Sequence, residues 1–367
     1  MTTVELFFDL VFVFTITQLT SVLIGEPSGI GLAKMALLLA IVWWMYGGYA
    51  WLTNMVPPVR LLPRLLLVLS MIGFLVVALA VPTAFGSGGV AFGLGYLLVV
   101  CVHAGLFLTS VPARRSILRL APVNIGGAVL LLVAAFLPAP VRWAIWALVP
   151  TVHWGLPLLR GSVGYEIRPA HFVERHGLVL IIAFGESVTA IGVGVSVGGT
   201  ALRLSPGLVL VAALALMVLL GLWWSYFGGA DELAEQRLVA ADPPTRARMA
   251  LAAFGRGYYL MLAGVIILAA GVKRSIGHPW ETGHLTPAVA IGGGVALYLA
   301  GDAALRHVLR LRPMLPRCVG LALAALSIPV GVAAPTSAQL AMLAAVLLGV
   351  FAVERWMAPV HSGPASG

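Results

Sequence analysis

Residues His171–Val195, HFVERHGLVLIIAFGESVTAIGVGV, join a cluster of charged and hydrogen-bonding side chains to a long apolar run. Glu186 interrupts that run eleven residues after Arg175, about 16 Å deeper along a helix. This is close to half of a hydrocarbon layer of about 30 Å. A carboxylate at that depth is costly unless it faces a cavity, has a partner or stays protonated. The stretch therefore predicts a membrane helix with an acid at its middle, which is either functional or a structural group that bonds to the backbone or a Trp N–H of a neighbouring helix.

The composition extends this prediction to all 367 residues of the chain. Hydrophobic residues make up 61% and charged residues only 10%, which a soluble domain of this size does not show. Apolar runs of about twenty residues recur along the whole length, without the short alternating segments of a membrane barrel. We expect an all-α integral membrane protein, a polytopic bundle of ten to twelve and most simply twelve transmembrane helices. Its partner is the lipid bilayer, and the net charge of +9 indicates topology rather than nucleic-acid binding.

Two motifs carry a family resemblance. They are HFVERHGLVLIIAFGESVTAIG, residues 171–192, and ELFFDLVFVFTITQL, residues 5–19. With them the chain resembles, over essentially its whole length, the bacterial low temperature requirement A (LtrA) family of multi-pass membrane proteins. That family is named for a growth phenotype, so the resemblance implies a membrane protein and a link to stress response but no particular reaction.

Twelve helices follow from the apolar runs and from the Gly and Pro clusters between them. Their expected ranges are 4–24, 30–54, 60–82, 89–109, 118–138, 141–159, 172–197, 206–229, 246–272, 286–309, 313–333 and 337–357. In the connections between them, sixteen basic residues fall on the side of the N-terminus. Only five fall on the other side, namely Lys34, Arg142, Arg203, Lys273 and Arg274. The positive-inside rule then predicts that both termini are cytoplasmic, and the family resemblance implies the bacterial cytoplasmic (inner) membrane.

A repeated aromatic motif indicates an internal duplication. Trp43–Gly48, WWMYGG, is echoed at an offset of 180 residues by Trp223–Gly229, WWSYFGG. We expect two six-helix repeats, 1–160 and 161–367, which are parallel because six is even. Helices 1 and 7, and helices 2 and 8, would face each other about the central axis. The aromatic residues that we regard as candidates either for interfacial belts or for the wall of a central cavity are Trp44, Tyr46, Trp224 and Tyr226.

The first predicted helix carries further candidate polar groups. Glu5 and Asp9 stand one turn apart on one face, where they form the mouth of a cation path or pair with Arg175 or with the basic loops. Gln18 lies near mid-depth, at the level expected for Glu186.

The segment His171–His176 contains the candidates Glu174, Arg175 and His176. Its two histidines are five residues apart, so they point to different sides of a helix and cannot share a metal ion. We expect a charged cap at the helix mouth, with no metal. No nucleotide-binding loop or dinucleotide fingerprint is present, and no cofactor is expected.

Arg256 lies about ten residues inside the ninth predicted helix. A buried arginine requires an acidic partner, and the candidates are Glu186, Asp231 and Asp302. The acids Asp231, Glu232 and Glu235 are expected in a solvated turn after the eighth helix, and the run Gly292–Gly294 is expected to allow close helix packing.

Three functions are compatible with these patterns. The first is a proton- or cation-coupled transporter, or ion-conducting protein, with Glu186 as its protonatable site. The second is an intramembrane enzyme that acts on a lipid-like or hydrophobic substrate with Glu186 as its acid or base, although no nucleophile or metal set is evident. The third is a non-catalytic stress or assembly factor, which predicts tolerance of Glu186→Gln. Protons, small cations and a second copy of the chain are candidate partners.

Overall fold

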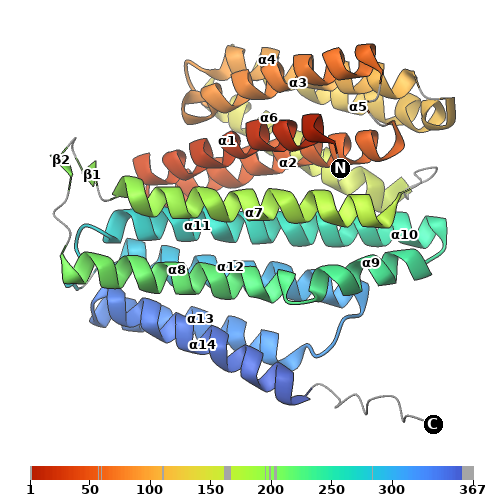
Figure 1. Cartoon of the computed structure of the whole chain (residues 1–367). Coiled ribbons are helices and arrows are strands. Elements are labelled where there is room, and N and C mark those ends of the chain that lie inside the picture. Colours follow the sequence, from red (N-terminus) through yellow and green to blue (C-terminus); the bar gives the residue numbers. More distant parts are fainter. Residues whose placement is uncertain are drawn as a thin grey trace, which may run out of the picture.

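The computed structural model describes residues 2–56, 58, 60–109, 111–160, 167–194, 196–197, 200–201, 205–282 and 284–357. These residues form one bundle of long helices that run side by side in stacked rows (Figure 1). Among them the only strand pairing joins β1 (Ser196–Val197) to β2 (Thr200–Ala201). The prediction of an all-α architecture is confirmed.

The helices follow one another with short connections. Those before residue 161 are α1 (Thr3–Gly25), α2 (Gly29–Met55), α3 (Leu61–Ala80) with the 3-10 turn η1 (Val81–Thr83), α4 (Gly89–Leu108), α5 (Val111–Ala134) and α6 (Ala139–Arg160). Those after it are α7 (Pro169–Gly194), α8 (Pro206–Phe227), α9 (Ala230–Ala240), α10 (Pro243–Ala250), the π-helical segment η2 (Leu251–Gly257), α11 (Tyr258–Ser275), α12 (Leu285–Leu309), α13 (Leu315–Ala333) and α14 (Thr336–Met357).

Within the described residues, ten helical spans are long and apolar enough to cross a membrane. Three of these are composite: α3 continues into η1, α8 continues into α9, and α10, η2 and α11 join into Pro243–Ser275. Each of the twelve predicted ranges overlaps a helical segment, but α6 and α7, at 22 and 26 residues, are not among the ten. A multi-pass membrane protein is therefore shown, while the count of twelve spans stays a prediction.

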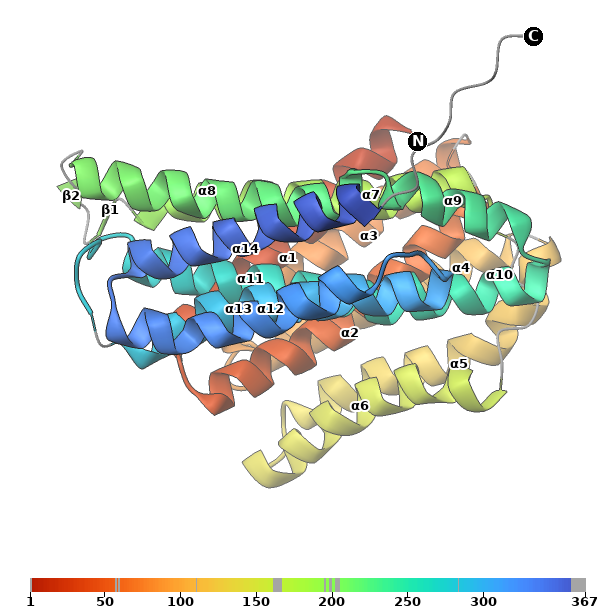
Figure 2. The same ribbon diagram turned by 90° about the horizontal axis from the view of Figure 1, so that it is seen from below.

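The long helices run between two ends of the bundle (Figure 1). α1 and α7 begin, and α2 and α14 finish, at the right-hand end in Figure 1, which we call the Arg175 end. Figure 2 shows α5 and α6 side by side at one edge of the bundle, next to α2. Which end faces the cytoplasm stays a prediction.

The acidic segment after α8 is a helix and not the solvated turn expected from the sequence. Gly229 takes a left-handed conformation, φ 108°, which turns the chain between α8 and α9. Asp231 and Glu232 then occupy the first turn of α9 and Arg237 its last turn, so all three complement the helix dipole. This order of acidic and basic residues is a signal in the sequence that favours a helix.

Glycines bring α11 and α12 into close contact. A Cβ on Gly294 would lie 2.6 Å from the backbone nitrogen of Leu268 and 2.8 Å from the carbonyl oxygen of Gly264. Such backbone approach is the usual basis of tight helix pairs in membranes. At the adjacent Gly293 no atom of another described helix lies within 4 Å of the same position, so only one side of the glycine run packs on α11.

The two halves of the chain have the same pattern of helix neighbours. Before residue 161, α3 packs between α1 and α4, α4 packs on α5, and α2 packs on α6. After it, α11 packs between α7 and α12, α12 on α13, and α8 on α14.

Between the halves, α1 contacts α7 as predicted. The expected facing of the second and eighth predicted helices was wrong, because α7 and α11 lie between α2 and α8 (Figure 1).

Candidate functional site

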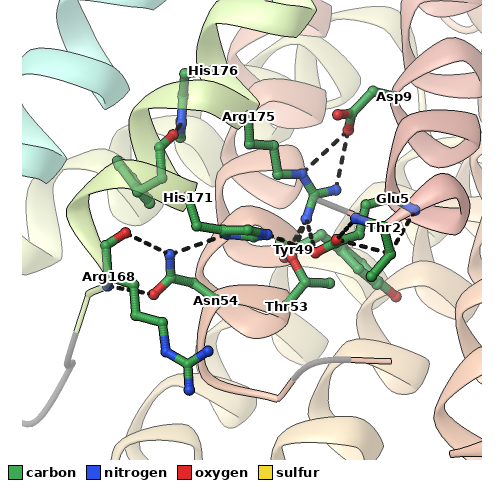
Figure 3. A network of polar contacts seen from close by, with 11 residues as sticks. Thr2, Glu5, Asp9, Tyr49, Thr53, Asn54, Arg168, His171, Arg175 and His176 are labelled. Atoms are coloured by element: carbon green, nitrogen blue, oxygen red, sulfur yellow. Dashed lines mark hydrogen bonds and ion pairs between the residues drawn. The ribbon is translucent and has the colours of Figure 1, made fainter. Parts of the chain in front are cut away.

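A completely buried arginine lies where α1, α2 and α7 meet at the Arg175 end (Figure 3). The guanidinium of Arg175 donates to one oxygen of Asp9, Oδ1, from Nε at 3.3 Å and from Nη2 at 3.1 Å. Its Nη1 donates to the carbonyl of Tyr49 at 3.2 Å and to the hydroxyl of Thr53. A buried charge is tolerated only with such pairing, so these bonds fasten the three helices together.

Glu5, one turn before Asp9, completes the acidic side of this cluster. Its Oε1 lies 3.9 Å from Arg175 Nη1 and 3.2 Å from His171 Nε2. Its Oε2 accepts the backbone N–H of Thr2 at 2.7 Å and the Thr2 hydroxyl at 2.8 Å, which forms a capping box at the start of α1. The carboxylate thus caps α1 and faces α7 at once.

Asn54 fixes the orientation of His171. The Asn54 amide accepts the backbone N–H of Arg168 at 2.7 Å and donates to the Arg168 carbonyl at 3.1 Å, which assigns its oxygen and its nitrogen. That nitrogen also lies 3.3 Å from His171 Nδ1, so Nδ1 is the acceptor. The proton of a neutral imidazole is then on Nε2, which faces Glu5.

With His171 neutral, two buried carboxylates share a single buried guanidinium. Glu5 and Asp9 are 1% and 0% exposed, and Arg175 is 0% exposed. When both acids are ionised, the cluster therefore carries one excess negative charge, which one added proton would neutralise. Asp9 Oδ2 is a place for that proton, because it is buried and has no hydrogen-bond partner among the described residues.

Aromatic rings surround the pair. The Arg175 guanidinium lies 5.3 Å from the ring centre of Phe8 and 5.5 Å from that of Tyr46. The hydroxyl of Tyr46 is buried and, within the described part of the chain, unpaired, like Asp9 Oδ2. Tyr46 in turn stacks on Trp43 at 4.9 Å, which connects the charged cluster to a cavity.

The cavity has a volume of about 330 Å³ and lies between α2, α4, α5, α6, α7 and η2. Its lining residues include four tryptophans, Trp43, Trp44, Trp51 and Trp154. His176, the residue after Arg175, belongs to the wall. The aromatic cavity and the charged cluster are therefore built on the same turn of α7.

Comparison with known proteins identifies the family. The profile described as "Bacterial low temperature requirement A protein (LtrA)" matches residues 1–352. The chain belongs to this family. It is also 30% identical over 326 residues to an uncharacterized protein, RA0937, of Rhizobium meliloti (strain 1021), which covers 83% of this chain and 76% of that protein. The two motifs that resemble the LtrA family lie on α1 and α7, the helices that supply the charged side chains of the cluster.

Several predicted site residues of this LtrA-family protein come together. Glu5 and Asp9 pair with Arg175, which was one of the two alternatives predicted for these acids. Tyr46 lies beside them. Trp44 and His176 line the cavity. Trp44 Nε1 donates to the amide oxygen of Asn124 at 3.0 Å, and its ring stacks on His153.

Other predicted residues lie elsewhere. Glu174 is exposed, and Trp224 is 55% exposed, so this tryptophan does not wall a cavity as its counterpart Trp44 does. Tyr226 is buried against Tyr258. Gln18 and Glu186 are half-buried on α1 and α7, and neither side chain has a hydrogen bond or ion pair among the described residues.

The expected pairing of Arg256 was wrong. Arg256 lies exposed on η2 and has no ion pair with any acid that the structure describes. Asp302 is instead paired with Arg306 at 3.0 Å and with Arg317 at 3.5 Å. Both of these arginines are buried, and Arg317 also makes a two-bond contact with Glu354, at 2.6 and 2.7 Å.

Sequence reasoning did not single out Tyr49, Thr53 and Asn54. They reach Arg175, Arg168 and His171 over separations of 114 to 126 residues. Their only local signal is the position of polar residues near the end of α2, where a membrane helix commonly becomes polar.

Proposed function

We propose that this protein is a proton-coupled membrane transporter in the bacterial cytoplasmic membrane, with the Arg175 end facing the cytoplasm. The observation that supports it best is the charge imbalance at that end. Two buried carboxylates share one arginine, and when His171 is neutral the cluster carries one excess negative charge. A cluster of this kind exists in two states, with and without one proton, and intramembrane ionisable groups commonly mark proton relays.

The two states differ in what holds the helices together. When Asp9 is ionised, it pairs with Arg175 and ties α1 to α7. When Asp9 is protonated, that ion pair is lost and Arg175 keeps Glu5 as its charged partner. Protonation thus changes the free energy of one arrangement of α1 against α7 relative to another, which is the requirement for coupling.

The same turn of α7 transmits this change to the cavity. Phe172 and His176 line the cavity, and the rings of His176 and Trp43 lie 5.9 Å apart. A shift of α7 that follows loss of the Arg175–Asp9 pair moves these residues. In this proposal the cavity is the site of the transported solute, and α7 connects it to the proton site at Asp9.

Glu186 remains the proposed protonatable group at mid-depth. It lies on the same helix as Arg175, about 16 Å away at the usual helical rise. In this proposal Glu186 binds protons that arrive from the other side of the membrane, and Asp9 exchanges protons with the cytoplasm. The matching helix neighbours of the two halves support a duplication at about residue 160, as in transporters built from repeats.

The test is proton flux into proteoliposomes that contain a pH-sensitive dye, under an imposed pH gradient and membrane potential. Wild type should move protons faster than protein-free liposomes, and Asp9→Asn and Glu186→Gln should lower the rate at least tenfold. Glu232→Gln, an exposed acid on α9, is the matched control and should behave as wild type. Folded wild-type protein without flux above protein-free liposomes would refute the proposal.

A second measurement separates proton binding from transport. Infrared spectroscopy detects the carbonyl band of a protonated carboxylic acid, and titration over about pH 5 to 8 should change this band in wild type. Asp9→Asn should remove part of the change, whereas Glu232→Gln should not. A band that is insensitive to pH in wild type would show that the cluster does not exchange a proton in this range.

A further inference from the structure

We infer that the cavity beside the charged cluster binds a compact amphipathic anion, a molecule with one apolar body and one acidic group. As the cargo of the transporter, this ligand class rests on the proposed function. As a binding property, it depends only on the cavity. The charges, the aromatic walls and one unpaired histidine each support the assignment.

The charge of the cavity wall selects against cations. Among the described residues that line it, Arg119 on α5 is the one with a permanent charge, and no carboxylate is present. Arg119 is exposed at the wall, so its guanidinium is available to a ligand. A carboxylate or phosphate accepts two bonds from such a group, whereas a cation would be repelled.

The body of the ligand has to be apolar. Seven aromatic side chains contribute to the wall, four of them tryptophans, so most of the enclosed surface is hydrophobic. A volume of about 330 Å³ is at the lower end of the range for small-molecule sites. It suits a small solute rather than a two-chain lipid.

The polar groups are arranged by depth. Arg119 is the ninth residue of α5, and Asn124 lies five residues further along this helix, about 7 Å deeper. Trp44, bonded to Asn124, marks the deep part of the cavity. The acidic group therefore lies toward the Arg175 end and the apolar body toward mid-depth.

His103 supplies an unsatisfied polar group in the same wall. It is 1% exposed, and both of its ring nitrogens lack a hydrogen-bond partner within the described residues. A buried polar group without a partner costs free energy, which a bound ligand can recover by bonding to it. An acidic ligand offers acceptor oxygens to a ring N–H of His103.

Gly47 provides a way to block the cavity. It lines the space, and a Cβ at this position would have no atom of another described helix within 4 Å. A leucine here fits the helix, and its side chain fills part of the cavity. Gly47→Leu should therefore remove binding without disturbing the fold.

The experiment uses tryptophan fluorescence of the detergent-solubilised protein, since bromine quenches indole emission on contact. The probes are a bromine-labelled medium-chain fatty acid, its methyl ester and a trimethylammonium compound with the same chain. We expect saturable quenching by the acid and at least tenfold weaker quenching by the ester and by the ammonium compound. Gly47→Leu should abolish the saturable part.

Variants on α5 test whether Arg119 binds the acidic group of the ligand. Arg119→Gln should weaken binding of the acid about tenfold and leave the ester unchanged, and Arg119→Lys should restore most of the affinity. Arg114→Gln, an exposed arginine outside the cavity wall, is the matched control and should have no effect. Equal loss in both glutamine variants would indicate a general surface charge and would overturn the inference.

Three further results would overturn it. These are equal binding of acid and ester, tightest binding of the ammonium compound, and saturable quenching that survives Gly47→Leu. Displacement of the acid by a phosphatidate but not by unlabelled fatty acid would assign the cavity to a membrane lipid and would contradict the argument from volume. Binding is measured without a membrane, so failure of proton flux leaves this result intact and refutes only the transport proposal.

Discussion

Arg175 donates two hydrogen bonds to one carboxylate oxygen of Asp9 across 166 residues of sequence, and both side chains are completely buried. The other oxygen of Asp9 has no hydrogen bond within the described residues. This uneven pairing leaves one oxygen of a buried carboxylate without a hydrogen bond, as is also the case for Oδ1 of Asp302. We therefore expect the stability of the protein to depend on both Arg175 and Asp9.

Removal of Arg175 should be strongly destabilising. Arg175→Met leaves Glu5 and Asp9 buried without their cation, and such a loss typically costs about 3–5 kcal/mol. Thermal or chemical unfolding in detergent measures this cost. The double variant Arg175→Met/Asp9→Asn should recover part of the stability, because only one buried acid then remains. A double variant no more stable than the single one would show that packing, rather than charge, accounts for the effect.

The two neighbouring glycines of α12 should respond differently to alanine. Gly294→Ala places a methyl group against the backbone of α11 and should cost about 1–3 kcal/mol through overpacking. Gly293→Ala has open space at the same position and should be neutral or slightly stabilising. Unfolding of the two variants under identical conditions compares them directly. Equal destabilisation would contradict the close approach of α11 and α12.

Asn54 should control the order of the chain just before α7. Asn54→Ala leaves the backbone N–H and carbonyl of Arg168 without their side-chain partner, at a cost of about 1–3 kcal/mol. Hydrogen exchange should therefore become faster at residues 167–172. Ser21→Ala, which removes a hydroxyl bonded only within its own helix, is the control and should leave this segment protected.

The loop before α12 provides a prediction about pH. Hydrogen bonding from His278, aided by His284, holds the pKa of the exposed Glu281 carboxyl below its usual value of 4.5. A lowered folded-state pKa stabilises the fold fully above the unfolded pKa, and this contribution is lost as the pH falls through the lowered value. The melting temperature of wild type should thus fall more steeply below about pH 4.5 than that of Glu281→Gln. Parallel curves would show that this contact does not contribute to stability.

Local patterns in the sequence were sufficient to predict the positions of the helices. Each apolar run of about twenty residues coincides with a helix, because a helix satisfies its own backbone hydrogen bonds and needs only apolar side chains to enter a membrane. The glycine run of α12 and the acids at the start of α1 were also recognisable from spacing alone. By the same reasoning Arg256 was expected to be buried, yet it faces outward on η2. Position along a helix does not specify which side faces a neighbour.

The sequence by itself determined that this chain is a helical membrane protein with acids on α1 and a basic cluster on α7, since composition and periodicity are local properties. The tertiary structure alone decided that Asp9 pairs with Arg175, that Asp302 pairs with Arg317, and that Trp44 rather than Trp224 lines a cavity. These contacts depend on how helices far apart in the chain rotate and pack against each other. That rotation is set by the sum of many weak side-chain contacts, which no single motif records.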